Sequence, residues 1–296
     1  MPCRTKAGKT RRRFPDPLMD HMKHLAPLAG AIDSHCHLAF TAARGVPVND
    51  ILTRCFGTGM SAVLDIAVTA DDIAERLKLT HGFPHVVHSV GVHPAEAARA
   101  DAAGVSTILR DAAATCPSVV AIGETGLDWY RGRRNAAAQY ALFEAQLQLA
   151  CELDLPLIIH NRDAADDILA LLRTSLPPRG GIMHCYSAHP DYVAEFVDLG
   201  FALSFAGNLT FPRAEETRQA AVAVPQEWLL VETDSPFLAP VPARGRPNHP
   251  GYIGHTYRAL AALRRQPLDE LTRHVAQNFA RLFPSAPLAP ARFDAG

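Results

Sequence analysis

Two histidines at the end of the first apolar run are spaced so that both can bind one metal ion. The five residues 33–37, with sequence DSHCH, end a short run that begins at Ala31. On an extended strand, residues two apart point to the same side, so His35 and His37 share a face about 7 Å apart. Imidazole nitrogens suit zinc, manganese, iron or nickel better than calcium or magnesium alone. This pair by itself is a weak signal, because two histidines reach this spacing by chance.

Other residues with metal-binding side chains end further apolar runs along the chain. They are His93, Glu124, His160, His184 and Asp234. The set of four histidines at positions 35, 37, 160 and 184, with Glu124 and Asp234, suffices for two divalent metal ions with open coordination positions. Glu124 can bridge the two ions, a place that a carboxylated strand lysine would otherwise fill. Beyond Lys23 the chain has a single lysine, Lys78, in a segment that reads as a helix.

Each of these residues also has a purely structural explanation. A single histidine at a strand end is commonly a hydrogen-bonded polar residue at a barrel rim. Glu124 lies between two glycines and fits a turn, and Asp234 before Ser-Pro could cap the next helix. Six such residues, each at a separate strand end or in the pair of His35 and His37, do not coincide readily, so the sequence favours a metal centre.

The elements that must position these residues follow a regular alternation of strand and helix. Near-continuous apolar runs indicate strands buried on both faces, as in a parallel sheet covered by helices. Eight such runs centre on 31–33, 62–66, 86–92, 119–122, 155–159, 181–183, 201–205 and 229–231, and residues 135–153 have helical composition and period. This pattern predicts an α/β fold, a single (β/α)8 TIM-type barrel, with the metal site at the carboxyl ends of the strands. A doubly wound open sheet is the alternative, but no G-x-G-x-x-G turn follows the first run.

Several of these motifs resemble those of the TatD-type metal-dependent deoxyribonucleases, within the metal-dependent hydrolase superfamily. The motifs are Ile32 to Leu38, Gly91 to Pro94, Gly123 to Asp128, Glu232 to Pro236 and Asn278 to Phe283. The likeness covers residues 30–283 in order. It implies a metal-dependent phosphodiesterase, in particular a 3′→5′ exodeoxyribonuclease that acts on the ends of single-stranded DNA. Family members act on DNA ends, and some are proposed to hydrolyse other esters.

The resemblance also assigns roles to the candidate residues. It implies that His35 and His37 hold one metal ion and that His160 and His184 hold the other. Glu124 would bridge the ions, and Asp234 would bind metal and orient or deprotonate the attacking water. Asn161 stands where the family often has cysteine, and Ala188 where it often has glycine, which puts only the loop shape in doubt. Magnesium is often used in assays of the family, whereas four histidines favour a softer ion among Zn, Mn, Ni and Fe.

Substrate contacts can be predicted from residues that lie near the expected centre. A phosphate needs cationic or N–H partners, so Arg162, Arg246 and Asn248 are candidates, together with His93. A solvated charged turn explains the loop around Arg246 equally well. Four aromatic residues could stack on an unpaired base: Trp129, Tyr130, Tyr186 and Phe237.

Composition divides the chain into a basic leader, the barrel and a tail. Residues 1–28 hold seven Lys or Arg against two Asp or Glu, which leaves 22 basic and 28 acidic residues in the remainder. We expect residues 1–29 to form a disordered basic leader, residues 30–283 the hydrolase barrel, and residues 284–296 a loose Pro-rich tail. No apolar stretch approaches the length of a membrane span. Nothing in the sequence identifies an obligate protein partner.

The cysteines indicate a reducing compartment. Six cysteines are scattered without C-x-x-C pairs, which argues against a zinc ribbon and a disulfide framework and favours the cytoplasm. Cys36 and Cys185 adjoin candidate ligands, and strand alternation predicts that both are buried core thiols that face away from the site.

Three functions remain open from the sequence. The first is the exodeoxyribonuclease, with nucleic acid as substrate. The second keeps the metal ions but hydrolyses a carboxylic ester or an amide, for example a mischarged aminoacyl-tRNA. The third is a scaffold without catalysis that binds nucleic acid through the basic leader. The scaffold predicts binding that survives chelation and the change Asp234→Asn, whereas the nuclease predicts activity that chelation abolishes.

Overall fold

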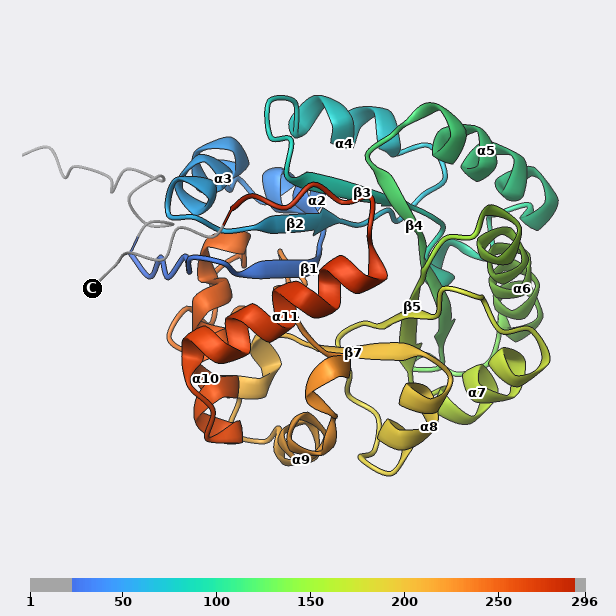
Figure 1. Ribbon diagram of the computed structural model, residues 1–296. Helices are drawn as coiled ribbons and strands as arrows, with labels where there is room; N and C mark the ends of the chain where they lie inside the picture. The colour runs from blue at the N-terminus through green and yellow to red at the C-terminus, as the bar shows by residue number, and fades with distance from the viewer. Residues whose placement is uncertain (1–22, 291–296) are drawn as a thin grey trace, which may run out of the picture.

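A parallel eight-stranded sheet curls into a nearly closed barrel (Figure 1). The computed structural model describes residues 23–290. Neighbouring strands pair in chain order from β1 to β8, each parallel to the next. The strands are β1 (Ile32–Cys36), β2 (Ala62–Asp65), β3 (Val86–Val90), β4 (Val119–Asp128), β5 (Leu157–Arg162), β6 (Gly181–Met183), β7 (Phe201–Phe205) and β8 (Leu229–Val231).

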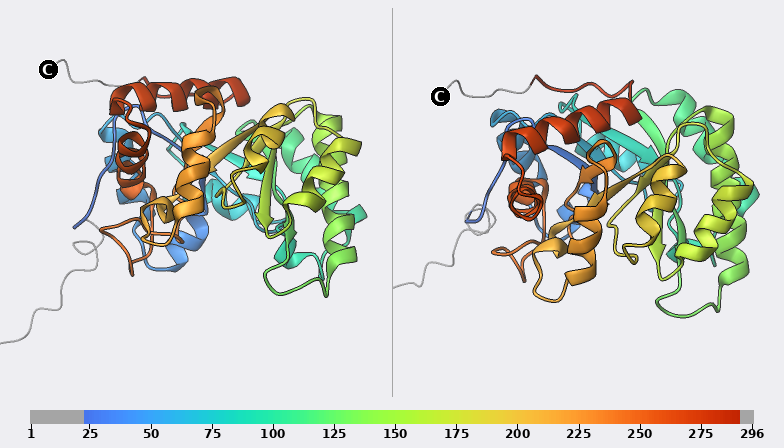
Figure 2. Two further views of the ribbon diagram at one scale, coloured as in Figure 1. Left: turned by 90° about the horizontal axis from the view of Figure 1, so that it is seen from below. Right: turned by 60° about the horizontal axis from the view of Figure 1, so that its bottom comes forward.

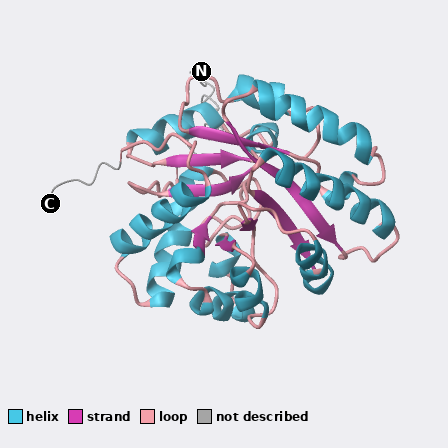
Figure 3. Ribbon diagram, turned by 45° about the vertical axis from the view of Figure 1, so that its right-hand side comes forward, coloured by secondary structure: helices cyan, strands magenta, loops and turns pink. Residues whose placement is uncertain are grey.

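Helices follow the strands and form an outer layer around them (Figures 2 and 3). The α-helices are α2 (Leu38–Ala43), α3 (Val48–Gly57), α4 (Ile73–Leu79), α5 (Ala102–Thr115), α6 (Ala136–Leu153), α7 (Ala165–Thr174), α8 (Tyr192–Asp198), α9 (Glu215–Ala223), α10 (Ile253–Arg264) and α11 (Leu268–Leu282). Short 3-10 turns are η1 (Pro94–Glu96), η2 (Gly207–Thr210), η3 (Gln226–Trp228) and η4 (Pro250–Tyr252). The prediction of a (β/α)8 barrel is confirmed.

The apolar runs of the sequence become the barrel wall. Nearly every residue of the eight strands is buried, because helices cover the outer face and side chains fill the interior. The main difference from the sequence prediction is the length of β4, which continues through Glu124 to Asp128. Glu124 therefore lies within a strand and not in a turn, although glycines flank it.

Those glycines allow β4 and β5 to approach closely at the level of Glu124. Gly123 and Gly126 have φ values of 139° and 131°, a region that side-chain-bearing residues rarely adopt. A Cβ atom at Gly126 would lie 2.1 Å from the carbonyl oxygen of His160, and one at Gly123 would lie 2.6 Å from that of Ile158. The absence of side chains at both positions keeps Glu124 beside the end of β5.

Side-chain hydrogen bonds help to join β8, and the segment that follows it, to β1. The Asp33 carboxylate accepts hydrogen bonds from the Thr233 backbone N–H at 2.8 Å and from its hydroxyl at 2.6 Å. The Ser34 hydroxyl donates to the carbonyl of Val231 at 3.1 Å. On β1, the Tyr257 hydroxyl from α10 donates to the Ile32 carbonyl and accepts from the Ile32 N–H, both at 3.0 Å.

We expect Tyr257→Phe to destabilise the barrel by about 2 kcal/mol, because it leaves the buried N–H and carbonyl of Ile32 without this partner. Tyr257 is fully buried, so water cannot replace the hydroxyl. Urea unfolding followed by circular dichroism measures the change. Tyr192→Phe is the matched control, since the Tyr192 hydroxyl contacts Asp166 on the surface. Equal effects of the two changes would contradict this role of Tyr257.

The described parts of both chain ends contact the barrel. The Ala289 N–H donates to the Ser61 carbonyl at 2.9 Å, and His85 lies 3.0 Å from the Pro287 carbonyl oxygen. Figure 1 shows this red segment running beside β2. Ala289 and Pro287 thus hydrogen bond to the barrel rim, because extended proline-rich backbone can still do so. The sequence predicted a loose tail over residues 284–296, of which 291–296 lie outside the described residues.

The leader is only partly described. Ala26 exchanges backbone hydrogen bonds with Gly251 and Gly254, so residues 23–29 also pack on the barrel. The predicted disorder of residues 1–22 lies outside the described residues. No helix within residues 23–290 is long and apolar enough to cross a membrane.

Candidate metal centre

His35 and His37 converge at the end of β1, as their spacing predicts. Their Nε2 atoms lie 3.2 Å apart, and the two rings meet nearly edge to face. His37 is oriented by the carbonyl of Ile66, which lies 3.3 Å from its Nδ1. Both side chains are buried. Two buried ring nitrogens directed at one point form half of a metal site.

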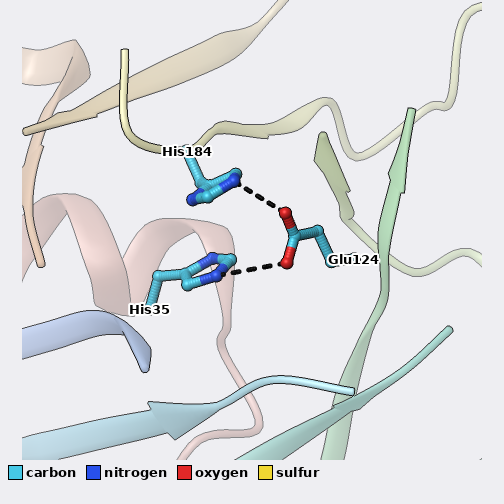
Figure 4. A group of neighbouring side chains, drawn as sticks. All are labelled: His35, Glu124 and His184. Atoms are coloured by element: carbon cyan, nitrogen blue, oxygen red, sulfur yellow. Dashed lines mark ion pairs between the residues drawn. The ribbon is translucent and has the colours of Figure 1, made fainter. Parts of the chain in front are cut away.

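Glu124 lies between this pair and the remaining histidines. Figure 4 shows its carboxylate facing His35 with one oxygen and His184 with the other. Its Oε2 atom is 3.5 Å from Nε2 of both His35 and His37. Its Oε1 atom is 2.8 Å from His160 Nδ1 and 2.8 Å from His184 Nε2. The ring of His184 stacks on that of His35 with centroids 3.8 Å apart. One carboxylate therefore faces two groups of imidazoles, one with each oxygen.

His93 joins the second group of imidazoles. Its Nε2 atom lies 3.5 Å from Glu124 Oε1 and 3.4 Å from His160 Nδ1. The sequence predicted His93 as a candidate contact for the substrate phosphate. Its position beside Glu124 makes it one of the donors around the carboxylate.

Asp234 completes the other side of the centre. Its Oδ1 atom is 3.6 Å from His37 Nε2 and 3.9 Å from His35 Nε2. The Asp234 backbone N–H donates to the His35 carbonyl at 2.9 Å, which couples the segment after β8 to β1. Asp234 has a φ of 53°, a left-handed conformation that aspartate tolerates better than most residues. The alternative of a helix cap does not describe this side chain.

Three overlapping groups of these side chains could hold a metal ion. The groups are His35, Glu124 and His184; His35, His37 and Asp234; and His93, Glu124 and His160. The arrangement fits divalent cations because imidazole nitrogens face one another and face carboxylate oxygens in a buried space. A cation among them would bind these nitrogen and oxygen atoms together.

Two further carboxylates hold histidines of the centre from behind. Glu232 Oε1 lies 3.4 Å from His184 Nδ1, and Asp128 Oδ2 lies 3.4 Å from His160 Nε2. Such partners fix the ring orientation and raise the basicity of a ligating histidine. Neither residue was assigned a role from the sequence. For Glu232 a signal was present, because it stands two residues before Asp234.

Electrostatics divides the five histidines into two kinds. Burial lowers the pKa of His93 to about 4 and lowers the pKa values of His35 and His37, so these rings are neutral near neutral pH. Burial also opposes charge on His184, but Glu124 and Glu232 together raise its pKa well above the ordinary value. The pKa of His160 is raised despite burial, by Asp128 and Glu124.

The carboxylates of the centre differ as well. Burial alone would raise the pKa of Glu124, yet His184, His93 and His160 hold it well below the usual range. Burial raises the pKa of Asp234 well above its ordinary value. Glu124 is thus an anion without any added cation, whereas Asp234 needs nearby positive charge to remain ionised.

We expect metal binding to release protons at neutral pH and to weaken as the pH falls. His160 and His184 have raised pKa values, so they carry protons that must leave before their nitrogens can bind a cation. Calorimetric titration with Mn²⁺ in two buffers of different ionisation enthalpy counts the released protons. Absence of proton release, with affinity constant from mildly acidic to mildly alkaline buffer, would contradict the assignment of these two residues.

The predicted substrate residues fall in different places. Arg162 is exposed at the end of β5, with its guanidinium 5.1 Å from the centre of the Tyr130 ring. Arg246 is partly buried in the loop after β8. Asn248 is fully buried, and its amide donates to the carbonyls of Thr233 and Phe237 at 2.8 and 2.7 Å. Asn248 therefore holds the loop that carries Asp234, and its Oδ1 accepts the His249 backbone N–H at 2.9 Å.

The four aromatic residues predicted to stack on a base differ in how exposed they are. Trp129 and Tyr186 are buried, and the Trp129 indole donates to Asp167 at 2.8 Å. Tyr130 is 69% exposed and Phe237 is 42% exposed, so these two can meet a ligand. The position of Cys36 as a buried thiol is confirmed.

The prediction for Cys185 is wrong. Cys185 is only partly buried and has a φ of 46°. Its thiol lies 3.9 Å from the side-chain nitrogen of Asn208. Strand alternation does not apply to it, because β6 already ends at Met183.

Comparisons of the sequence with a family model and with known proteins identify the same family. Residues 32–284 match the family described as TatD related DNase. The uncharacterized metal-dependent hydrolase YcfH of Escherichia coli is 38% identical over 255 residues, which span 85% of this chain and 95% of YcfH. The 3′-5′ ssDNA/RNA exonuclease TatD of Salmonella typhimurium is 33% identical over 243 residues, which span 79% of this chain and 92% of that protein.

A solved structure has the same architecture. The crystal structure of YjjV, a TatD homolog from Escherichia coli, matches with a TM-score of 0.79 and 30% identity. The match covers 86% of this chain and 98% of YjjV.

Proposed function

This chain belongs to the TatD family of metal-dependent hydrolases, and we propose that it is a 3′→5′ exonuclease that degrades single-stranded DNA from its end. One relative has the name of a 3′-5′ ssDNA/RNA exonuclease. The proposal includes a nucleic acid as substrate, divalent metal ions as cofactor and a cytoplasmic location. All five cysteines of the described region are free thiols, which is consistent with that location.

The observation that carries the proposal is the position of Glu124. Its two oxygens face separate groups of imidazoles at 2.8 to 3.5 Å, as a carboxylate that bridges two cations would. Pairs of divalent ions with a shared ligand are typical of enzymes that hydrolyse phosphodiesters. A bridging carboxylate at the open end of a barrel supports phosphodiester hydrolysis better than a single-ion site would.

Each residue of the centre receives a role in this proposal. His35 and His37, with Asp234, would hold one ion, and His160 and His184 would hold the other. Glu124 would bridge them. His93 lies close enough to Glu124 and His160 to act as a further donor or to meet the substrate phosphate.

Hydrolysis needs a water molecule that is oriented and deprotonated. When bound, the divalent ions would supply Lewis acidity, which lowers the pKa of water and stabilises negative charge on the phosphate. Asp234 would accept the proton of the attacking water, because its Oδ1 lies beside the ring nitrogens of His35 and His37 that would hold the ion. Glu232 and Asp128 would keep His184 and His160 in the required orientation.

Metal resupply tests this function. The metal-free protein is incubated separately with Mg²⁺, Mn²⁺ and Zn²⁺ and with single-stranded DNA labelled at its 5′ end. We expect a ladder of products shortened from the 3′ end, which chelation abolishes. A carboxylic ester substrate and an aminoacyl-tRNA are assayed in parallel. Hydrolysis of either one without any DNA cleavage would overturn the nuclease and favour an esterase or amidase.

A further inference from the structure

A cavity opens beside the metal centre, between η1 and the loop that joins β4 to α6. Its volume is about 610 Å³, within the range of small-molecule sites. Pro94, the neighbour of His93, forms one wall, and Asp128, the partner of His160, forms another. Figure 2 shows the green loop between β4 and α6 projecting beyond the strands. We call this cavity the loop pocket; two of its lining residues, Pro94 and Asp128, adjoin or contact histidines of the centre.

The loop pocket carries two arginines that no acidic residue neutralises. Arg131 and Arg134 line it, both are exposed, and neither has an ion-pair or hydrogen-bonding partner for its guanidinium within residues 23–290. Arg133, which lies between them, instead pairs with Asp167 at 2.5 Å. Asp128 contributes the single carboxylate of the lining, and it already accepts the Tyr130 N–H at 2.8 Å and contacts His160.

An aromatic ring borders the same cavity. Tyr130 lines the loop pocket and is 69% exposed. Such a ring can stack on a nucleobase while nearby arginines hold the backbone, which is how many proteins bind single strands.

A second cavity on the other side of this loop has the opposite charge. Its volume is about 570 Å³, and its walls include Asp163, Asp166, Asp167 and Glu216 against one arginine, Arg133. A phosphodiester backbone would be repelled there and attracted to the loop pocket. The difference in charge between the two cavities therefore favours binding of a negatively charged strand on the side of the loop pocket.

We propose that the loop pocket is an anion subsite that binds the phosphate of the nucleotide next to the scissile bond, with Arg131 and Arg134 as its ligands and Tyr130 as a stacking surface. The inference rests on the proposed function and narrows its substrate to chains with at least two phosphates. A mononucleotide or a neutral ester would reach the metal centre without using these arginines.

Binding without turnover tests the subsite. Fluorescence anisotropy measures the affinity of 5′-labelled trithymidylate in EDTA, where hydrolysis does not occur. We expect Arg131→Gln/Arg134→Gln to raise Kd at least about tenfold, the size of a missing hydrogen bond to a charged group. The slope of log affinity against log salt concentration should fall by about 0.7 for each phosphate that the variant no longer neutralises. Arg131→Lys/Arg134→Lys, which keeps both charges, should retain the slope.

The matched control removes two positive charges elsewhere. Arg54→Gln/Lys78→Gln changes exposed residues of α3 and α4 and should leave Kd unchanged. Unaltered affinity in the Arg131/Arg134 variant, or equal weakening in the control, would overturn the subsite. Cleavage of DNA by the wild-type protein in Mn²⁺ tests the nuclease separately from the subsite. Binding that depends on the two arginines, without cleavage, would support the subsite and refute the nuclease. Cleavage with binding that does not depend on these arginines would support the nuclease and refute the subsite.

Discussion

Glu124→Gln is expected to lower DNA hydrolysis by about a thousandfold, the size seen when a preorganised charge-stabilising group is removed. The amide keeps the shape of the side chain but removes the anion that faces His35 and His37 with one oxygen and His160 and His184 with the other. Metal affinity should fall by more than about a hundredfold, since even outer partners of metal ligands contribute 10- to 100-fold.

Elemental analysis of the purified variant measures the loss of metal, and single-turnover cleavage measures the loss of DNA hydrolysis. Glu96→Gln is the matched control, because Glu96 lies in η1 near the same end of the barrel and pairs with Arg99 on the surface. The control should retain metal and activity. A Glu124→Gln protein with full metal content and near-normal turnover would refute the bridging role.

Asp234→Asn is expected to lower turnover by about 10²- to 10⁴-fold, the range for loss of a catalytic proton acceptor. Metal should remain bound at the histidines, because an asparagine oxygen can still face His35 and His37. The decrease should therefore appear in the rate of the single-turnover step while metal content stays close to that of the wild type.

Asp191→Asn serves as the control for this change, since the Asp191 side chain is 88% exposed and pairs with His189 on the surface. Loss of metal in parallel with activity in Asp234→Asn would show that the change acts through metal binding, and would contradict the role of Asp234 as proton acceptor. Unchanged turnover would remove Asp234 from the chemistry.

The strand pattern of the sequence predicted the fold because a parallel barrel needs doubly buried strands, and such strands are nearly continuous apolar runs. The spacing of His35 and His37 predicted their shared direction for a similar reason, since alternation is a local property of β1. Glu124 was predicted at a strand end but lies within β4, because glycines at 123 and 126 let the strand continue beside β5.

The rest depends on contacts that no local pattern records. The amide of Asn248 is a side chain of the type that contacts phosphates, yet it donates its hydrogen bonds to the carbonyls of Thr233 and Phe237. Cys185 follows the end of its strand, so alternation could not predict its direction. The closure of the barrel through Asp33 and Tyr257 joins residues about 200 positions apart, and no sequence motif indicates it.

The most direct measurement follows release of the 3′-terminal nucleotide from a 5′-labelled single strand by Mn²⁺-loaded protein. A second strand carries phosphorothioate at its 3′-terminal linkages, and a third carries it at its 5′-terminal linkages. We predict rapid shortening of the unmodified strand, strong inhibition by the 3′ modification and none by the 5′ modification. Failure to shorten any strand, or shortening that only the 5′ modification blocks, would contradict a 3′→5′ exonuclease.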